Sequence, residues 1–182
     1  MIDLHSHLLP GVDDGSRSVE QSVRVLGELM ALGVTDVCLT PHLVASKAGD
    51  GIPPAHDRAF EALSAVAPAG VRLHRGADVM LDRPLTPEAA ANPGIRLGGT
   101  RYILVEFSRI VPVTTVESAL RTVSELGLIP LLAHPERYSS CSVASAKRWR
   151  ATGALLQVDA TTLFAAQGRG ERARALLAAG MA

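Results

Sequence analysis

One pair of histidines with metal-binding spacing occurs at the very start of this 182-residue chain. His5 and His7 close the first apolar segment, in MIDLHSH, and their i, i+2 spacing places both imidazoles on one face of an extended strand. Two imidazoles on one face suit chelation of a divalent cation, but a single H-x-H at a strand end is also a common coincidence. The pair therefore needs support from residues elsewhere in the chain.

Four later apolar segments are each followed by, or end in, another side chain that can bind a metal ion. These residues are His42, Asp78, Glu106 and His134. Alone, a histidine is more often structural and an aspartate often caps or turns, but a buried Glu106 would need a partner or a metal ion to offset its desolvation. The carboxyl ends of parallel strands meet at one edge, where α/β barrels carry their active sites. Together these residues predict a binuclear or trinuclear site for Zn, Mn or Fe.

Three more polar residues lie next to these segments. Asp13 and Asp14, in PGVDDGS, are either turn residues or a source of one further ligand. Arg137 stands three residues after His134. It either forms a surface salt bridge with Glu136 or presents a guanidinium fork to a phosphate oxygen at the metal site.

The elements that must position these residues alternate along the chain. Strands are predicted over 1–5, 34–40, 71–79, 101–107, 127–134 and 154–160, and helices over 18–32, 56–67, 114–126, 143–152 and 169–180. Alternation of this kind predicts an α/β fold with a mostly parallel sheet and about six βα units in a single domain, residues 1–182. The Gly/Pro-rich segments 44–54 and 81–100 are expected to be loops or lids.

Glycines mark the junctions between helices and strands. Gly33, Gly127 and Gly153 each end a predicted helix, as a left-handed cap allows, and a strand follows at once. Gly180 ends the last predicted helix in the same way, and the sequence ends two residues later. The periodicity therefore predicts a further strand that this sequence does not contain.

Composition narrows the classes of function. The formal net charge is zero, so neither nucleic acid nor membrane insertion is expected, and no apolar run approaches the roughly 20 residues of a membrane span. The two cysteines, Cys38 and Cys141, indicate no disulfide framework, and we expect a cytoplasmic protein. His56 and His74 are expected to be surface or structural residues. The possibility of a homo-oligomer stays open.

The segments MIDLHSHLLPGVDDGS, TPH, GADV, ILVEF and AHPERY resemble the PHP-domain superfamily over the whole chain and in order. Within it, the chain is most similar to the bacterial manganese-dependent protein-tyrosine phosphatases of capsule and exopolysaccharide gene clusters. The resemblance implies a distorted (β/α)7 PHP barrel, here lacking the last strand and incomplete at the C-terminus. It also implies Mn²⁺, or Zn²⁺ or Fe²⁺, with two to three ions in the intact family.

The resemblance gives roles to eight residues. It implies that His5 and His7 bind a first metal ion and that Asp78 bridges this ion and a second one. Glu106 and His134 would complete the second site, and Asp14 and His42 would bind a third ion. Arg137 would contact the phosphate. Two departures stand out. The family usually has glutamate at the position of Asp78, and its S-D-x-H ligand segment has no counterpart in this sequence.

The implied function is hydrolysis of a phosphomonoester by metal-bound hydroxide. The substrate would be a phosphotyrosine protein, namely a bacterial tyrosine kinase of polysaccharide export. Cys141 lacks the Cys-x5-Arg phosphate loop of cysteine-dependent phosphatases, which favours the metal-dependent class. Two alternatives remain: another PHP phosphoesterase such as a histidinol-phosphatase-like enzyme, and a truncated, inactive metal-binding domain.

Overall fold

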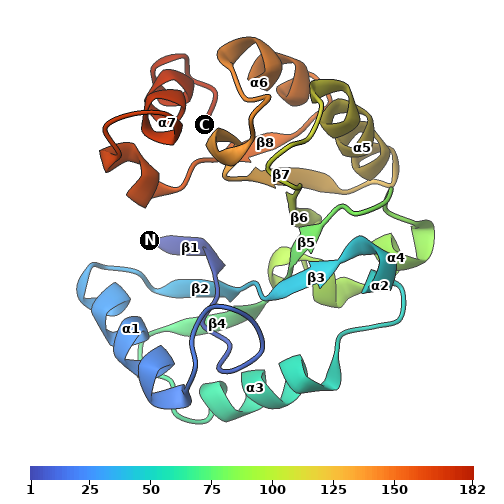
Figure 1. The fold of residues 1–182 in the computed structure, drawn as a ribbon. Helices are drawn as coiled ribbons and strands as arrows, with labels where there is room; N and C mark the ends of the chain where they lie inside the picture. The colour runs from blue at the N-terminus through green and yellow to red at the C-terminus, as the bar shows by residue number, and fades with distance from the viewer.

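Eight parallel strands and seven α-helices make up the fold in a computed structural model that describes residues 1–182 (Figure 1). The strands are β1 (Ile2–Ser6), β2 (Asp36–Leu39), β3 (His42–Val44), β4 (Arg72–Arg75), β5 (Asp78–Met80), β6 (Tyr102–Glu106), β7 (Ile129–Ala133) and β8 (Leu155–Gln157). The helices are α1 (Val19–Ala31), α2 (Ala45–Ala48), α3 (Pro54–Ser64), α4 (Pro87–Ala91), α5 (Val113–Glu125), α6 (Val143–Arg150) and α7 (Arg169–Ala178). Short 3₁₀ turns are η1 (Pro93–Ile95), η2 (Leu97–Gly99), η3 (Pro135–Arg137) and η4 (Ala160–Phe164).

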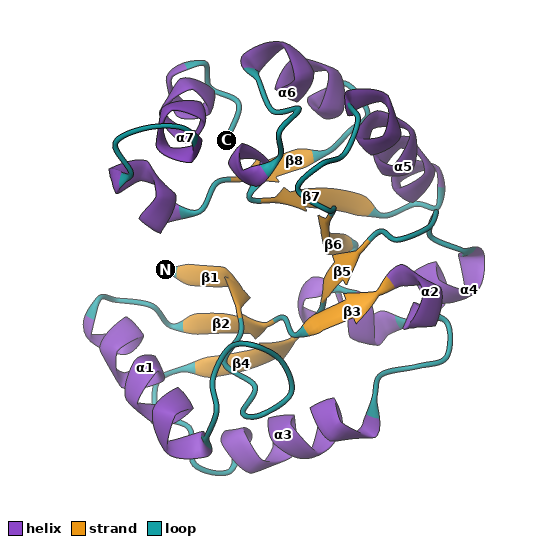
Figure 2. Ribbon diagram, viewed as in Figure 1, coloured by secondary structure: helices purple, strands orange, loops and turns teal.

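The strands form two sheets, in the orders β1-β2-β4 and β3-β5-β6-β7-β8. Every pairing is parallel. The helices lie around the outside of the strands (Figure 2). The α/β class with parallel sheets, predicted from the alternation of elements, is confirmed.

The predicted single strand over 71–79 is wrong, because the chain forms β4 and β5 in different sheets. The break falls at Gly76 and Ala77, between the two strands. A Cβ on Gly76 would lie 3.0 Å from the Leu97 side chain and 3.3 Å from that of Thr40, so a larger residue at this bend would push on both neighbours. The bend carries Asp78 into the second sheet.

His42 follows β2, as the sequence predicted, and it also begins a further strand, β3. β3 pairs with β5 in a register that places His42 opposite Asp78. The segments 44–54 and 81–100, expected to be loops, contain the short helices α2 and α4. Both helices pack into the core, since Ala48 of α2 and Ala89 of α4 are fully buried.

Helix α1 begins directly after Ser18, the residue that caps its N-terminus. The hydroxyl of Ser18 accepts a hydrogen bond from the Gln21 backbone N–H at 3.2 Å, which caps the helix. The Gln21 side chain accepts from the backbone N–H of Arg17, not from that of Ser18, so the capping box is not reciprocal. Gly33 then ends the helical segment with a φ of 86°, the left-handed conformation that its position predicted.

Apolar packing outside the sheets holds the strands in place. The larger core packs the five-stranded sheet against α5 and α6, and includes the fully buried Trp149, whose ring N–H donates to the Val113 carbonyl at 3.2 Å. A smaller core around Leu26 and Leu63 packs α1 and α3 against the three-stranded sheet. None of the helices has the length and apolar character needed to cross a membrane.

Candidate metal centre

Histidines and carboxylates from several strands and from the loop after β1 converge in three groups. His5 and Glu106 lie at or near the carboxyl ends of β1 and β6, and His134 follows β7. Asp78 does not end a strand, as the sequence predicted, but begins β5. Within each group the candidate ligand atoms lie within 4.8 Å of one another. The groups are His5, Asp78 and His134; His7, Asp14 and His42; and His42, Asp78 and Glu106. The structure therefore brings together all seven residues that the sequence proposed as metal ligands, although they come from segments up to about 130 residues apart (134 − 5 = 129).

The two N-terminal histidines direct their Nε2 atoms towards each other. The Nε2 atoms of His5 and His7 lie 3.1 Å apart. The opposite ring atoms are engaged elsewhere: Nδ1 of His5 lies 3.0 Å from Oε1 of Gln157, and Nδ1 of His7 lies 2.8 Å from Oδ2 of Asp13. Because both acceptors lack a proton to give, they select the tautomers that donate from Nδ1 and leave Nε2 with a lone pair for a cation.

Asp13 and its neighbour Asp14 contact different histidines: Asp13 contacts His7, whereas Asp14 lies near His42. The carboxylate of Asp13 also accepts from the backbone N–H groups of Gly15 at 3.0 Å and His42 at 3.3 Å. Burial raises the pKa of Asp13, but the hydrogen bonds from His7, Gly15 and His42 together outweigh it and lower that pKa to about 2. The sequence could not distinguish a ligand from an orienting residue in the Asp13–Asp14 pair, because both stand in the same turn.

Asp78 lies between two of the groups. It is fully buried, and neither of its carboxylate oxygens has a hydrogen-bond partner. Its Oδ2 lies 3.4 Å from Nε2 of His5 and 3.5 Å from Nδ1 of His42, too far for hydrogen bonds of normal strength. A buried carboxylate without donors is costly, and a cation is a natural partner for it.

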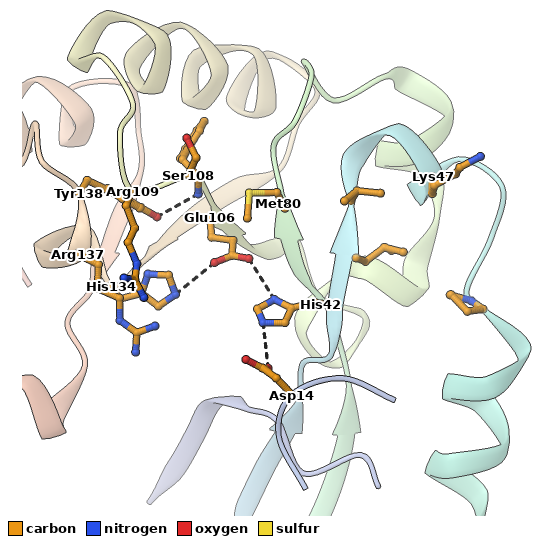
Figure 3. Close-up of a pocket in the computed structure, with 14 residues that line it drawn as sticks. Asp14, His42, Lys47, Met80, Glu106, Ser108, Arg109, His134, Arg137 and Tyr138 are labelled. Atoms are coloured by element: carbon orange, nitrogen blue, oxygen red, sulfur yellow. Dashed lines mark hydrogen bonds and ion pairs between the residues drawn. The ribbon is translucent and has the colours of Figure 1, made fainter. Parts of the chain in front are cut away.

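His42 lies between the buried Glu106 and the exposed Asp14. Its Nδ1 lies 3.1 Å from Oε1 of Glu106, and its Nε2 lies 3.5 Å from the exposed carboxylate of Asp14 (Figure 3). The hydrogen bond to Glu106 raises the pKa of His42 to about 9. A divalent cation bound here would compete with that proton for the ring.

His134 is held in a strained backbone conformation. Its φ of 34° is the only positive value among the non-glycine residues. Two backbone bonds define this geometry: its N–H donates to the Gln157 carbonyl at 2.7 Å, and its carbonyl accepts from the Arg137 N–H at 2.9 Å. Burial and the nearby Arg137 lower the pKa of His134 to about 4, so the ring is neutral at physiological pH, the form that ligates metals.

Arg137 does not pair with Glu136, the protein partner that the sequence offered. Glu136 is fully buried and accepts from the backbone N–H of Asp159 at 3.1 Å, so the expected surface pair does not form. Nη2 of Arg137 instead donates to Oδ2 of Asp159 at 2.6 Å. The sequence analysis missed Gln157, which ends the short strand β8, and Asp159, which lies two residues after it. A local sequence pattern does not show which residues pack beside such a strand.

A glycine allows the loop after β1 to close on the centre. The backbone N–H of Ser16 donates to the carbonyl of His7 at 2.9 Å. A Cβ on Gly15 would lie 2.1 Å from that carbonyl oxygen and 2.4 Å from the Cβ of His7. Only glycine therefore permits the approach that brings Asp13 and Asp14 to the histidines.

The remaining histidines and both cysteines lie away from these groups. His74 contacts Asp36 at 2.8 Å, and His56 is buried on α3, in agreement with their expected structural roles. Cys38 and Cys141 are buried and unpaired. Burial raises the pKa of each thiol to about 11, which keeps both protonated and unreactive at neutral pH.

A pocket of about 650 Å³ opens beside the metal groups. Its polar side includes His42, Glu106 and His134. Its other side is largely apolar and is lined by Leu43, Val44, Pro53, Met80 and Phe107. The pocket therefore joins a place for cations to a surface that fits an apolar group.

Comparison with known proteins places the chain in a family. The family model described as capsular polysaccharide synthesis, CpsB/CapC, matches residues 1–180. This chain belongs to the CpsB/CapC family. The CapC protein of Staphylococcus aureus is 30% identical over 75% of this chain and 54% of its own length. The CpsB of Streptococcus agalactiae serotype III, a tyrosine-protein phosphatase, is 29% identical over 77% of this chain and 58% of its own length. The chain thus spans somewhat more than half the length of these CpsB/CapC relatives.

A solved structure agrees with the fold. It comes from work on YwqE from Bacillus subtilis and CpsB from Streptococcus pneumoniae, described as unique metal-dependent tyrosine phosphatases. It superposes with a TM-score of 0.79, covers 100% of this chain and 76% of its own, and shares 23% sequence identity. The likeness shows that this CpsB/CapC member has the fold of those proteins.

Proposed function

We propose that this chain is a metal-dependent protein-tyrosine phosphatase that regulates the synthesis of capsular or exopolysaccharide. The observation that carries the proposal is the environment of Asp78, a fully buried carboxylate without a hydrogen bond, with histidines on both sides. Membership of the CpsB/CapC family and the names of the relatives support the same reaction class.

The donor set fits two or more divalent cations. Imidazole nitrogens and carboxylate oxygens suit Mn²⁺, Zn²⁺ and Fe²⁺, of which we propose Mn²⁺. We assign His5 and His7 to a first ion, and Asp78 to a bridge between it and the second. The second ion would also be held by Glu106 and His134, and a third by Asp14 and His42. Such ions supply Lewis acidity and a nucleophile derived from water at neutral pH.

The residues of this chain then have separable tasks. Gln157 and Asp13 orient the rings of His5 and His7 through their Nδ1 atoms. Arg137 presents its guanidinium to an oxygen of the phosphoryl group, where negative charge is concentrated. The apolar side of the pocket, at Met80 and Phe107, supports an aromatic leaving group, which favours a phosphotyrosine over a small hydrophilic phosphomonoester.

The finer architecture and setting are part of the same proposal. The two sheets of parallel strands with helices outside support a distorted (β/α)7 barrel of the PHP type. We propose a phosphotyrosine protein as substrate, a bacterial tyrosine kinase of polysaccharide export, and a cytoplasmic location.

The test compares substrates and metal content in one preparation. The purified chain is assayed with a phosphotyrosine peptide, the same sequence carrying phosphoserine, and histidinol phosphate, each with Mn²⁺ and after chelation. Bound metal is measured per chain. We expect Mn²⁺-dependent turnover of the phosphotyrosine peptide above the other two. Preference for histidinol phosphate would replace the proposal with a small-molecule phosphatase, and absence of both metal and turnover would reject catalysis by this chain.

A further inference from the structure

The positive charge of Arg137 is already balanced within the protein. Its guanidinium lies 2.6 Å from the carboxylate of Asp159, and Asp159 is fixed in turn by the N–H and hydroxyl of Thr161, at 2.9 Å and 2.7 Å. Burial raises the pKa of Asp159, but the hydrogen bonds that it accepts from Thr161 and Arg137 outweigh this effect and lower the pKa to about 2. Arg137 therefore brings hydrogen-bond donors to the pocket but little net charge.

A second arginine enters the same pocket from another element. Arg109 follows β6 by three residues and lines the pocket together with His134 and Arg137. Figure 3 shows its side chain running past Tyr138 towards those two residues. The Arg109 carbonyl accepts from the Ser139 N–H at 2.8 Å, which ties its loop to the segment that follows Arg137.

Unlike Arg137, Arg109 has no partner for its charge. Its guanidinium is exposed and makes no ion pair and no hydrogen bond with the rest of the chain. The other cation of the pocket, Lys47, lies on its far side and is 3.9 Å from Asp50 (Figure 3). Arg109 is thus the unpaired cation on the Arg137 side of the pocket.

We propose that Arg109 binds the phosphoryl group of the substrate as a second guanidinium beside Arg137. This inference rests on the proposed phosphatase function. A phosphate monoester carries close to two negative charges at neutral pH, and the centre itself contains the carboxylates of Asp14, Asp78 and Glu106. A guanidinium with free donors and an uncompensated charge matches such a dianion, both in charge and in its fork of N–H groups.

The experiment uses inorganic phosphate as the probe. The Mn²⁺-loaded chain is compared as wild type, Arg109→Gln, Arg109→Lys and Arg101→Gln. Arg101 is an exposed arginine just before β6, at the opposite end of the strand from Arg109, and serves as the matched control. Phosphate affinity is measured by isothermal titration calorimetry, KM and kcat are measured with p-nitrophenyl phosphate, and circular dichroism and bound metal verify the fold and the centre.

We expect Arg109→Gln to weaken phosphate binding and raise KM about fivefold, the size expected for an exposed charge pair. Arg109→Lys should recover part of the loss, and Arg101→Gln should match wild type. The result that overturns the inference alone is a wild type that hydrolyses the substrate while Arg109→Gln binds phosphate equally well. A wild type that neither binds phosphate nor turns over substrate overturns both this inference and the proposed function.

Discussion

Arg137 and Asp159 join the turn after β7 to the segment after β8 through a hydrogen bond of 2.6 Å between Nη2 and Oδ2. Two hydrogen bonds from backbone N–H groups lie beside it: the His134 N–H donates to the Gln157 carbonyl, and the Asp159 N–H donates to the Glu136 carboxylate. The strained His134 and the guanidinium of Arg137 are therefore fixed by the same short stretch of chain, Gln157–Asp159.

Asp159→Asn should destabilise the protein while keeping its turn, because the Oδ1 that accepts from Thr161 remains and only the charged contact to Arg137 is lost. We expect a loss of about 1 kcal/mol in the free energy of unfolding near neutral pH, measured by urea denaturation. Thr161→Ala, which removes only one hydrogen bond to Oδ1, is the control and should cost less.

The same variant has a predicted pH dependence. The pKa of Asp159 is lowered from 3.8 to about 2, so the folded state holds the ionised form. The resulting stability is fully present above the unfolded pKa of about 4 and is lost as the pH falls towards 2. The stability difference between wild type and Asp159→Asn should therefore be constant from neutral pH to about 5 and shrink below that. A difference that grows on acidification would contradict this assignment.

Asp78→Asn should remove most of the stabilisation that divalent cations give to the folded protein. A ligand that binds the folded state raises its stability, so Mn²⁺ should raise the melting temperature of the wild type and a chelator should lower it. In Asp78→Asn the buried carboxylate between His5 and His42 is gone, and both shifts should largely disappear. Asp50→Asn, at an exposed position two residues after the end of α2, is the control. An undiminished Mn²⁺ shift in Asp78→Asn would exclude Asp78 as a bridge.

Asp13→Asn should weaken metal binding without removing a direct ligand. An amide at this position does not reliably accept from Nδ1 of His7, so the ring loses its fixed tautomer. Loss of such an outer partner typically lowers metal affinity by about tenfold or more. Competition with a fluorescent chelator measures the effect, and Asp36→Asn, which contacts His74 away from the centre, should leave it unchanged.

Gly15→Ala should damage the loop that carries Asp13 and Asp14. The new Cβ would overlap the carbonyl of His7, and the loop must move away from the histidines. We expect lower stability together with fewer bound ions per chain. Gly27→Ala is the matched control, since its Cβ would meet nothing within 4 Å on α1 and alanine favours a helix by up to about 1 kcal/mol. Equal behaviour of the two variants would mean that the loop tolerates the displacement.

Replacing both cysteines should leave hydrolysis intact. Cys38 and Cys141 are buried, and their pKa values of about 11 keep the thiols protonated. The double substitution Cys38→Ala and Cys141→Ala should retain kcat within about twofold, and iodoacetamide should not inactivate the wild type. A large loss of kcat with unchanged melting temperature would indicate thiol chemistry instead.

The sequence by itself determined the class of fold and the set of residues at the centre. The spacing of apolar residues along a segment shows whether one face or both faces of that helix or strand are buried. This information is contained within the segment itself. It was enough to predict parallel strands and, from the rule that their carboxyl ends share an edge, to gather His5, Asp78, Glu106 and His134.

Only the tertiary structure decided how those residues are supported. It divided the segment 71–79 into two strands at Gly76, gave Asp13 and Asp14 different partners, and paired Arg137 with Asp159 instead of Glu136. Each of these outcomes depends on contacts between segments far apart in the chain. The reason is physical: periodicity records which face of an element is buried, whereas the partner of a polar side chain depends on which loops are packed beside it.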